Sequence, residues 1–492
     1  MTIPATQAEV AGLLGRLTGA APIETHISAV FVGRNDAYKL KKAVALPFVD
    51  FSALEDRARF CLRELELNRP NAPGIYRDVQ PVIRGPDGVL RLGGEGEMID
   101  WVLRMAPVSA GDFLDAVAAA GGLDARLQDA LADAVADLLA KAPVAEGVDS
   151  VRRMELVLQG NLEGCLDIGL DRGRVEAVGA AMRAALARLA PLLRDRAAKG
   201  FVRRCHGDLH LGNLCLWQGR PVAFDALEFD ETLARIDVGY ELAFLLMDLE
   251  VRLGRDAACR VMNRVLARSF DIASLAAMPF WMAQRALVRA KLEPARGRDG
   301  LPYLEAAERY LRPVPPRLVA IGGVQGTGKT FVSRFVAPRI GVAPGALHLR
   351  SDEIRKRLAG VAPEDRLPPA AYGAEVSANV HDAMFAAARI ALEAGHSVVL
   401  DATFLDPAVR RAAQDAAGEA RFDGIWLEAP VDVLRARIAA RRDDASDATV
   451  EVMERAAQVD PGLLAGWRRA DASRDPRPEL CKSLALNGDS CA

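Results

Sequence analysis

Residues 323–330 read Gly323-Val324-Gln325-Gly326-Thr327-Gly328-Lys329-Thr330 and match the pattern G-x-x-x-x-G-K-[ST]. They follow an apolar strand predicted at 318–321 and open a predicted helix, which is the context that a phosphate-binding loop requires. Glycines let backbone N–H groups converge on phosphate oxygens, and the helix N-terminus adds positive partial charge. Lys329 is predicted to neutralise the β- and γ-phosphates of ATP, and Thr330 to offer its hydroxyl to Mg²⁺.

Strands and helices alternate around this loop. Short apolar strands are predicted at 318–321, 346–349, 397–400 and 424–427, separated by helical stretches of ten or more residues. This alternation favours βαβ units and a parallel sheet. A stiff Pro-rich linker at 312–316 precedes them. We therefore predict an α/β P-loop domain over 317–475, followed by a tail at 476–492.

Two carboxylates fall where such a domain needs them. Asp401 ends an apolar strand, so it is predicted at the carboxyl edge of the sheet, where it would hold Mg²⁺. Asp352 and Arg355 lie three residues apart at a helix start and share one face. Asp352 would accept a proton from an acceptor hydroxyl and Arg355 would bind an anionic group of the acceptor. The alternative for Asp352 is an N-cap.

An Arg-rich helix end follows farther along the chain. Arg435, Arg437, Arg441 and Arg442 precede the polar run 443–447. This pattern is typical of a lid that closes over ATP, with Arg437 and Arg441 as its candidate ligands, and equally of a solvated basic face.

The region 317–475 resembles the small P-loop kinases, the group that contains gluconate kinase and polynucleotide 5′-kinase. The resemblance rests on the phosphate loop, Ser351-Asp352-x-x-Arg355, Leu400-Asp401-Ala402-Thr403 and the lid arginines. In that family the Asp-x-x-Arg pair handles the acceptor. The resemblance therefore implies phosphorylation of a hydroxyl.

The first 311 residues have a different pattern of predicted strands and helices. Strands are predicted at 27–32, 37–41, 79–83, 89–92 and 98–105 around a helix at 51–68. Helical periodicity then dominates, at 113–139, 175–193, 238–253 and 277–290. A polar, β-like segment at 202–228 interrupts the helices. The pattern predicts a bilobal domain, with an N-lobe at about 20–106 and a helical C-lobe at about 107–311.

The polar segment holds a second phosphate-transfer constellation. Cys205-His206-Gly207-Asp208 leads to Asn213, and Asp225 follows on the next strand. Asp208 is predicted to accept the proton of an attacking hydroxyl, and Asn213 and Asp225 to hold a Mg²⁺ that bridges the phosphates. His206 is predicted to be structural. The role of His210 stays open.

This segment is similar to the aminoglycoside phosphotransferase and choline kinase branch of the protein-kinase-like fold, in which His-Gly-Asp replaces His-Arg-Asp. The resemblance covers about 20–295. It implies that Lys39 forms ion pairs with the phosphates of ATP and that Glu64 orients Lys39, with Lys41 and Glu66 as alternates. It also implies that 98–105 forms the hinge that contacts adenine. Only Gly33 stands where protein kinases have a glycine triplet, which favours this branch.

The composition excludes several classes. The chain has 492 residues with 51% hydrophobic and 26% charged side chains, a globular composition. With a net charge of −3, the chain has no excess of basic residues, so duplex nucleic acid is not expected as its main partner. Seven scattered Cys without a C-x-x-C pair, no signal-peptide pattern and no long apolar stretch favour a cytoplasmic protein without membrane contact.

The predicted fold class is an α+β bilobal protein-kinase-like domain followed by an α/β P-loop domain with a parallel sheet. The leading hypothesis is a bifunctional ATP-dependent kinase, using Mg²⁺, whose partners are small hydroxylated acceptors. The alternative is a nucleotide-sensing regulatory protein with a non-catalytic kinase-like module. A third hypothesis is a P-loop domain that acts on nucleotide sugars or nucleic-acid ends.

Overall fold

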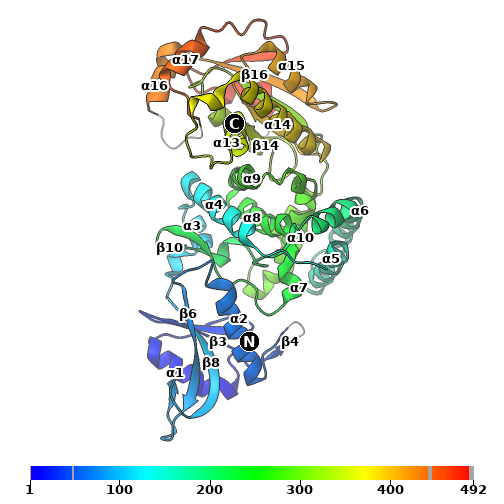
Figure 1. Cartoon of the computed structure of the whole chain (residues 1–492). Coiled ribbons are helices and arrows are strands. Elements are labelled where there is room, and N and C mark those ends of the chain that lie inside the picture. Colours follow the sequence, from blue (N-terminus) through cyan, green and yellow to red (C-terminus); the bar gives the residue numbers. More distant parts are fainter. Residues whose placement is uncertain (1, 47–48, 441–445, 487–492) are drawn as a thin grey trace. The chain divides into compact units, whose positions relative to one another are not determined.

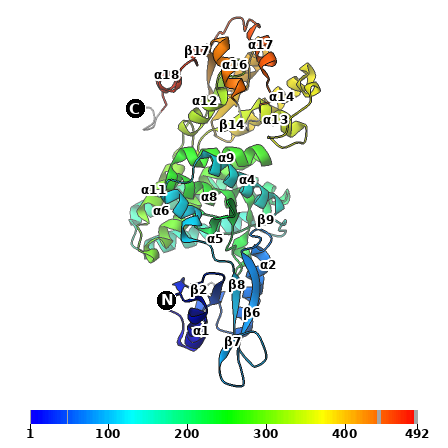
Figure 2. The same cartoon turned by 90° about the vertical axis from the view of Figure 1, so that its left-hand side faces the viewer.

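The computed structural model describes residues 2–46, 49–440 and 446–486 (Figures 1 and 2). The chain divides into two compact units. Unit 1 comprises Met1–Ser150 and Leu193–Leu245, and unit 2 comprises Val151–Leu192 and Leu246–Ala492. Each unit contains one of the two candidate sites.

Unit 1 is built on a six-stranded antiparallel sheet. In spatial order its strands are β1 (Ile23–Glu24), β2 (Ser28–Val32), β3 (Ala37–Lys41), β8 (Glu97–Met105), β6 (Tyr76–Arg84) and β7 (Leu90–Leu92). Helix α1 (Ala8–Thr18) packs on the face that carries Phe31 and Val102. Helix α2 (Leu54–Asn68) packs on the opposite face through Leu65, near Leu103. The alternation of Val102 and Leu103 follows from the two-residue repeat of a strand.

The remainder of unit 1 is mostly helical, with short strand pairs. Its elements are β4 (Ala45–Leu46), β5 (Val49–Asp50), α3 (Leu114–Ala119), α4 (Ala125–Lys141), β9 (Val202–Arg204), β10 (Leu214–Trp217), β11 (Arg220–Ala223), α7 (Glu231–Ala234) and β12 (Arg235–Asp237). Helix α8 (Val238–Leu253) begins in this unit. Strands β10 and β11 form an antiparallel hairpin.

One helix prediction is wrong. The single helix expected at 113–139 is two helices, α3 and α4. Gly121 takes φ 73°, a left-handed conformation that ends α3. The Asp124 side chain then accepts a hydrogen bond from the Leu127 N–H and starts α4 as its N-cap.

Unit 2 begins with a group of long helices. They are α5 (Ser150–Asp167), α6 (Arg172–Ala198), α9 (Arg255–Ser269), α10 (Met278–Leu292) and α11 (Leu301–Tyr310). The helical periodicity expected at 175–193 and 277–290 is confirmed in α6 and α10. Trp281 of α10 is fully buried.

The rest of unit 2 is a five-stranded parallel sheet with helices. The spatial order is β14 (Leu347–Arg350), β15 (Val398–Asp401), β13 (Arg317–Gly322), β16 (Arg421–Glu428) and β17 (Trp467–Asp471). The helices are α12 (Lys329–Val336), α13 (Ser351–Leu358), α14 (Ala374–Glu393), α15 (Pro407–Asp415), α16 (Val431–Ala439), α17 (Val450–Ala457) and α18 (Arg477–Ser483). The predicted parallel sheet, and with it the predicted fold class, is confirmed.

The segment predicted as a tail at 476–492 contains α18. Leu480 and Leu484 are buried in the same apolar cluster as Val319 and Ile321 of the central strand. A seven-residue helix spans two turns, which is too short for a hydrophobic period to emerge from the sequence. Strand β17 was missed because three of its five residues, Arg468, Arg469 and Asp471, are charged, so it shows no apolar run.

Within the described ranges, no helix combines the length and apolarity needed to cross a bilayer.

Candidate functional site

The kinase-like site of unit 1 centres on Lys39 of β3. Its ammonium donates to Glu64 Oε1 at 2.7 Å and to Asp225 Oδ1 at 2.6 Å. Glu64 comes from α2 and has no exposed side-chain area, whereas Asp225 follows β11 and is 41% exposed. Residues far apart in the sequence therefore meet at one lysine, as the resemblance implied.

The two alternates have other partners. Lys41 donates to Glu64 Oε2 at 2.8 Å and to Glu228 Oε1 at 2.5 Å, and its side chain is 1% exposed. Glu66 pairs with Arg63 on the helix surface. Of the two lysines, Lys39 contacts Asp225, whereas the ion pairs of Lys41 in the described part of the chain are with Glu64 and Glu228. The geometry therefore favours Lys39 with Glu64, and assigns Lys41 and Glu228 to a second, fully buried pair.

Charge pairing governs ionisation in this cluster. Burial alone would raise the pKa of Glu64, but Lys39 and Lys41 outweigh it and hold that pKa well below its usual range. Burial would lower the pKa of Lys39, but Asp225 and Glu64 raise it well above its usual range. Glu64 is therefore ionised and Lys39 is protonated at neutral pH.

The loop that carries Asp208 is held by Asn213. The Asn213 Nδ2 donates to both the backbone O and Oδ2 of Asp208, each at 2.9 Å. The hairpin register continues from Leu214 opposite Ala223, and the Phe224 N–H donates to the Asn213 O at 3.1 Å. This register brings Asn213 beside the segment that leads into Asp225.

Two histidines support the loop. His206 Nε2 donates to the Phe224 O at 2.8 Å, and burial lowers the pKa of His206. A buried ring that ties two strands together is consistent with the structural role predicted for His206. His210 Nδ1 accepts from the Gly212 N–H at 3.0 Å, and its Nε2 lies 3.5 Å from Asp208 Oδ2. His210 thus lies against the predicted proton acceptor.

Asp225 has a strained backbone. Its φ is 60°, a left-handed conformation that a residue other than glycine rarely adopts. The Tyr76 hydroxyl accepts the Asp225 N–H at 2.9 Å, and Asn68 Oδ1 accepts the Ala226 N–H at 2.8 Å. Such strain persists where the surroundings over-determine it, and it concentrates at functional sites.

The donor set of this site fits Mg²⁺. The Asn213 amide nitrogen is engaged with Asp208, so Oδ1 is the Asn213 atom that could bind a metal. The Asp225 carboxylate, which is 41% exposed, could supply further oxygen ligands. Mg²⁺ prefers one or two protein oxygens together with phosphates and water.

The phosphate loop of unit 2 has the backbone that its glycines allow. Gly323, Gly326 and Gly328 take φ values of 139°, 87° and 86°. A Cβ on Gly323 would lie 2.6 Å from the Leu427 O, so glycine is required there. The Lys329 ammonium donates to the carbonyls of Gly323 and Val324 at 3.0 and 3.2 Å, across the loop. Gln325 and Thr327 complete the loop.

Thr330 and Asp401 meet beside the loop. The Thr330 hydroxyl donates to Asp401 Oδ2 at 2.7 Å. His348 Nε2 and Arg350 Nε lie 3.5 and 3.6 Å from the same oxygen. Burial would raise the pKa of Asp401, but His348, Arg350 and Lys329 lower it far below its usual range. A hydroxyl and an ionised carboxylate fit Mg²⁺ as hard oxygen ligands.

Asp352 and Arg355 lie in the first turns of α13. Burial is the main cause that raises the pKa of the Asp352 carboxyl, with Asp401 adding to it. Arg355 is 8% exposed, donates to the Ala371 O at 2.8 Å, and places its guanidinium 4.9 Å from the Tyr372 ring centroid. The alternative interpretation of Asp352 as an N-cap is wrong, because α13 begins at Ser351 with Arg350 at the N-cap position and Asp352 lies inside the first turn.

A cavity of about 510 Å³ adjoins the phosphate loop. Thr327, Gly328, Phe331, Arg437 and the segment 472–476 line it. Arg437 also donates to the Gly326 O at 3.5 Å. The predicted lid residue Arg441 lies outside the described residues.

Sequence reasoning missed several groups that the structure brings to these sites. Glu228 completes the charge cluster of unit 1 by pairing with Lys41. His348 and Arg350 reach Asp401, and 472–476 lines the cavity. The alternation of charged residues in Leu347-His348-Leu349-Arg350 was the available signal for the two that face Asp401.

Comparisons with known proteins agree with this division. A family model described as an AAA domain matches residues 318–459 and confirms the prediction of a P-loop domain. An uncharacterized protein of Mycobacterium tuberculosis (strain H37Rv), Rv2004c, is 30% identical in an alignment of 449 residues that covers 87% of this chain and 88% of the relative. Mb2027c of Mycobacterium bovis matches equally.

Solved structures show a local likeness to parts of this chain. A choline kinase from Cryptosporidium parvum matches 61% of this chain and 93% of its own, with 10% identity and a TM-score of 0.39. A sugar kinase from Janibacter sp. HTCC2649 matches 35% of this chain and 94% of its own, with 18% identity and a TM-score of 0.28. The topology described above, rather than these likenesses, defines the fold.

Proposed function

The chain belongs to the family of the mycobacterial protein Rv2004c, and from that premise and the geometry of its two sites we propose that it is a bifunctional ATP-dependent phosphotransferase. Each unit would transfer the γ-phosphate of ATP to a hydroxyl of a small molecule. The family relationship covers 87% of the chain, so it spans both sites.

In unit 1, Lys39 would bind the phosphates of ATP while Glu64 keeps its ammonium in place. Asp208 would accept the proton of the acceptor hydroxyl, and Asn213 holds that carboxylate through the bond at 2.9 Å. Asn213 Oδ1 and Asp225 would hold Mg²⁺, which neutralises charge on the phosphates when bound. Placing oxygens in this way is most of what phosphoryl transfer requires.

In unit 2, the backbone N–H groups of Gly323–Thr330 would surround the phosphates. The Lys329 ammonium would leave the carbonyls of Gly323 and Val324 and donate to phosphate oxygens instead. Thr330 and Asp401 would hold the second Mg²⁺. Asp352 would accept the proton of the acceptor, and Arg355 would position an anionic or polar group of it. Arg437 and the cavity of about 510 Å³ would receive the rest of the nucleotide.

The observation that carries the proposal is the pairing of Asp208 with Asn213. A module that only senses nucleotides needs the lysine and the metal ligands, but it has no use for a proton acceptor. Here the proton acceptor is held by two hydrogen bonds from the same residue that is positioned to bind metal. This arrangement supports catalysis over the regulatory alternative.

The test uses the full chain with γ-labelled ATP, Mg²⁺ and a metabolite extract, followed by mass spectrometry of the labelled products. Wild type, Asp208→Asn, Lys329→Ala and the double variant are compared. We expect each single variant to lose a different labelled product and the double variant to lose both. Glu66→Gln serves as the control, because Glu66 is an exposed residue that pairs with Arg63 on the surface of α2.

Tight binding of ATP without any labelled product in wild type would contradict the proposal and favour a sensor. A product whose formation survives both variants would also contradict it.

A further inference from the structure

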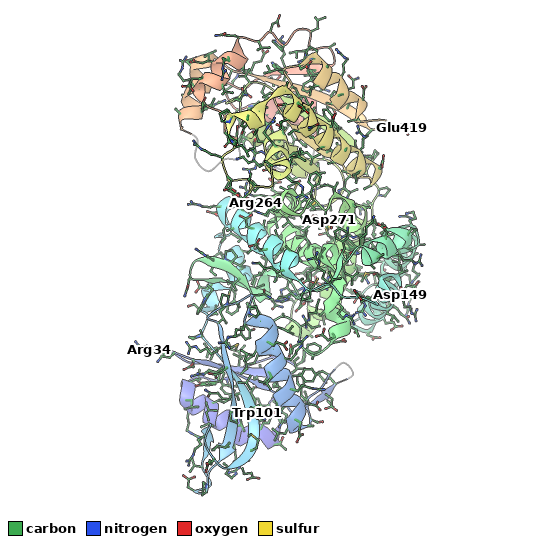
Figure 3. The ribbon with its side chains drawn as sticks, viewed as in Figure 1. Arg34, Trp101, Asp149, Arg264, Asp271 and Glu419 are labelled. Atoms are coloured by element: carbon green, nitrogen blue, oxygen red, sulfur yellow. The ribbon has the colours of Figure 1, made fainter. Side chains whose placement is uncertain are left out.

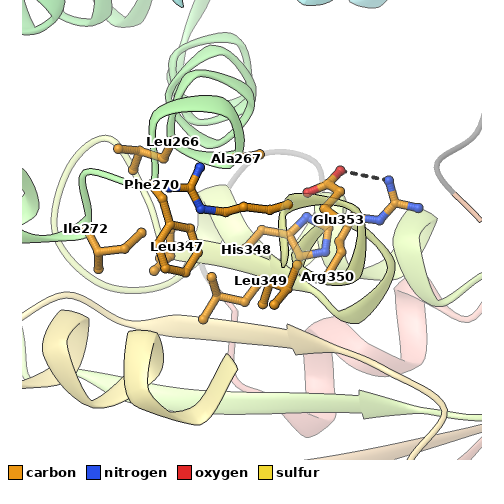
Figure 4. A pocket seen from close by; sticks show the side chains of 11 residues that line it. Leu266, Ala267, Phe270, Ile272, Leu347, His348, Leu349, Arg350 and Glu353 are labelled. Carbon is orange, nitrogen blue, oxygen red and sulfur yellow. Dashed lines mark hydrogen bonds and ion pairs between the residues drawn. The ribbon is translucent and has the colours of Figure 1, made fainter. Parts of the chain in front are cut away.

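Helix α9 lies against the outer edge of the P-loop sheet within unit 2. Strand β14 ends the spatial order of that sheet, so one of its sides has no neighbouring strand. Figure 4 shows Leu266, Ala267 and Phe270 from the end of α9 next to Leu347 and Leu349 of β14. The helix lies some eighty residues before the strand and precedes the Pro-rich linker, so the sequence alone placed it in the kinase-like part.

Cys259 ties α9 into the core of the sheet. Its side chain is 2% exposed and belongs to the same buried cluster as Val319 and Val399 of the inner strands. A Cβ on Gly345 would lie 2.7 Å from the Cys259 Sγ, so the approach of α9 requires glycine in the loop before β14. Helix α9 is therefore part of the packed P-loop fold.

Asn263 occupies the edge of β14 with its carboxamide. The Asn263 Nδ2 donates to the Ala346 O at 3.0 Å, and Asn263 Oδ1 accepts the His348 N–H at 2.6 Å. A residue of a parallel strand opposite Leu347 would bond to the same carbonyl and the same N–H. One side chain thus replaces one peptide group of a missing neighbouring strand.

The second amide hydrogen of Asn263 is also used. Its Nδ2 donates to the Cys259 O, one turn earlier in α9, at 3.0 Å. The carboxamide therefore faces two carbonyl oxygens with its nitrogen and one N–H with its oxygen. A carboxylate at this position would place an oxygen against both carbonyls, which makes Asn263→Asp a nearly isosteric and disruptive change.

Strand β14, which Asn263 holds, carries two side chains that lie near the carboxylate of Asp401, a proposed Mg²⁺ ligand. His348, whose N–H Asn263 accepts, places its Nε2 3.5 Å from Asp401 Oδ2. Arg350 lies two residues on, on the same face, with its Nε 3.6 Å from that oxygen. Asp401 in turn accepts the Thr330 hydroxyl. A shift of β14 along or away from α9 would move these groups relative to Asp401.

We propose that Asn263 is a positioning residue of the P-loop site, which fixes the edge strand β14 and through it sets His348 and Arg350 against Asp401. The proposal rests on the function proposed above for that site. It makes α9 a part of the P-loop fold, in which this helix takes the place of a further strand beside β14. It also implies that a chain beginning at 317 lacks a part of its own active site.

The experiment compares full-length wild type, Asn263→Asp and Arg264→Ala. Arg264 is the next residue of α9, labelled in Figure 3, and pairs with the half-exposed Glu364, so it controls for a change on this helix. Three quantities are measured: Lys329-dependent turnover, the Mg²⁺ concentration for half-maximal turnover, and amide hydrogen exchange of the peptide covering 346–350. Asp208-dependent turnover in the same samples reports whether unit 1 is intact.

We expect Asn263→Asp to lower the Lys329-dependent kcat about ten- to a hundred-fold, since a displacement of about 1 Å costs that much. The KM for ATP should change little, the Mg²⁺ requirement should rise, and exchange at 346–350 should accelerate. Arg264→Ala should match wild type in all three. A wild-type Mg²⁺ requirement and wild-type exchange in Asn263→Asp would overturn the proposal.

His348→Phe provides an independent arm. It leaves the backbone N–H for Asn263 but removes the ring nitrogen near Asp401. The Mg²⁺ requirement should rise while exchange at 346–350 stays at the wild-type rate. A wild-type Mg²⁺ requirement in His348→Phe would overturn the proposal even if Asn263→Asp fails to fold. If wild type shows no Lys329-dependent turnover, the proposed function fails, and unchanged exchange in Asn263→Asp would still contradict the role of Asn263.

Discussion

The two candidate sites differ in what holds them together. In unit 1, the site is a network of opposite charges in which Lys39 joins Glu64 to Asp225 and Lys41 joins Glu64 to Glu228. In unit 2, the site is a backbone loop whose glycines adopt conformations that other residues avoid, closed by one hydroxyl–carboxylate bond.

This difference predicts different sensitivities. A buried charge network depends on each member, because loss of one partner leaves an uncompensated charge in a low dielectric. A phosphate loop that is built from backbone groups keeps its fold when one side chain is removed, but the site loses its function. The predictions below use paired substitutions that set one site against the other.

The largest effect is expected from the two proton acceptors. Asp208→Asn should lower Lys329-independent turnover, and Asp352→Asn should lower Lys329-dependent turnover, each by about a hundred- to ten-thousand-fold. Neither change should affect the other site. The steady-state rate at which each variant forms the product of each site will show this. Equal loss of both products in either variant would mean that the chain has a single active centre.

Within unit 1, Lys39→Met and Lys41→Met should separate catalysis from stability. Lys41 is 1% exposed between two carboxylates, so its loss should destabilise unit 1 by ~3–5 kcal/mol. Lys39 is 12% exposed, and Glu64 keeps Lys41 when Lys39 is lost, so Lys39→Met should abolish the Asp208-dependent turnover of unit 1 with a smaller change in stability. Chemical unfolding and ATP turnover measure the two effects. Equal destabilisation by both changes would contradict the assignment.

Within unit 2, Thr330→Val and Thr330→Ser should differ in their need for Mg²⁺. Valine has the shape of threonine but lacks the hydroxyl that donates to Asp401 at 2.7 Å. We expect the Mg²⁺ concentration for half-maximal turnover to rise about ten-fold in Thr330→Val, as for loss of one strong hydrogen bond, and to stay near wild type in Thr330→Ser. A Mg²⁺ titration that shows no difference would remove Thr330 from the metal site.

The smallest effect concerns pH. Burial raises the pKa of Asp352 above its ordinary value of 3.8, so the folded protein favours the neutral carboxyl. The ionised form therefore costs stability at any pH at which the unfolded chain holds this carboxyl ionised, and the cost disappears as pH falls below the ordinary value. Asp352→Asn should raise Tm at pH 7 and leave it unchanged near pH 3. A lower Tm at pH 7 would show that the charge stabilises unit 2.

The predictability of each site follows from how its residues are arranged along the chain. Gly323–Thr330 is contiguous, so one motif located the loop, and the end of an apolar strand located Asp401. Lys39 and Lys41 are two residues apart on a strand and point to one face, so periodicity could not choose between them. The choice depends on Asp225, which is 186 residues away from Lys39.

Contacts without local signature escaped the sequence entirely. Asn263 is a single polar residue on a buried helix face, and nothing near it indicates an edge strand that follows 83 residues later. His348 lies within the predicted strand 346–349 and Arg350 directly follows it, but which face of the strand meets Asp401 is set by the packing of the sheet. The break at Gly121 was visible in the sequence as Gly121-Gly122, and apolar periodicity on both sides obscured it.

The central claim is that the chain holds two separate sites for Mg·ATP. Isothermal titration calorimetry of the full chain with a non-hydrolysable ATP analogue and Mg²⁺ measures this directly, in wild type, Lys39→Met, Lys329→Ala and the double variant. The account predicts two bound nucleotides per wild-type chain, one in each single variant, and none in the double variant. One nucleotide in wild type, or undiminished binding in either single variant, would contradict it.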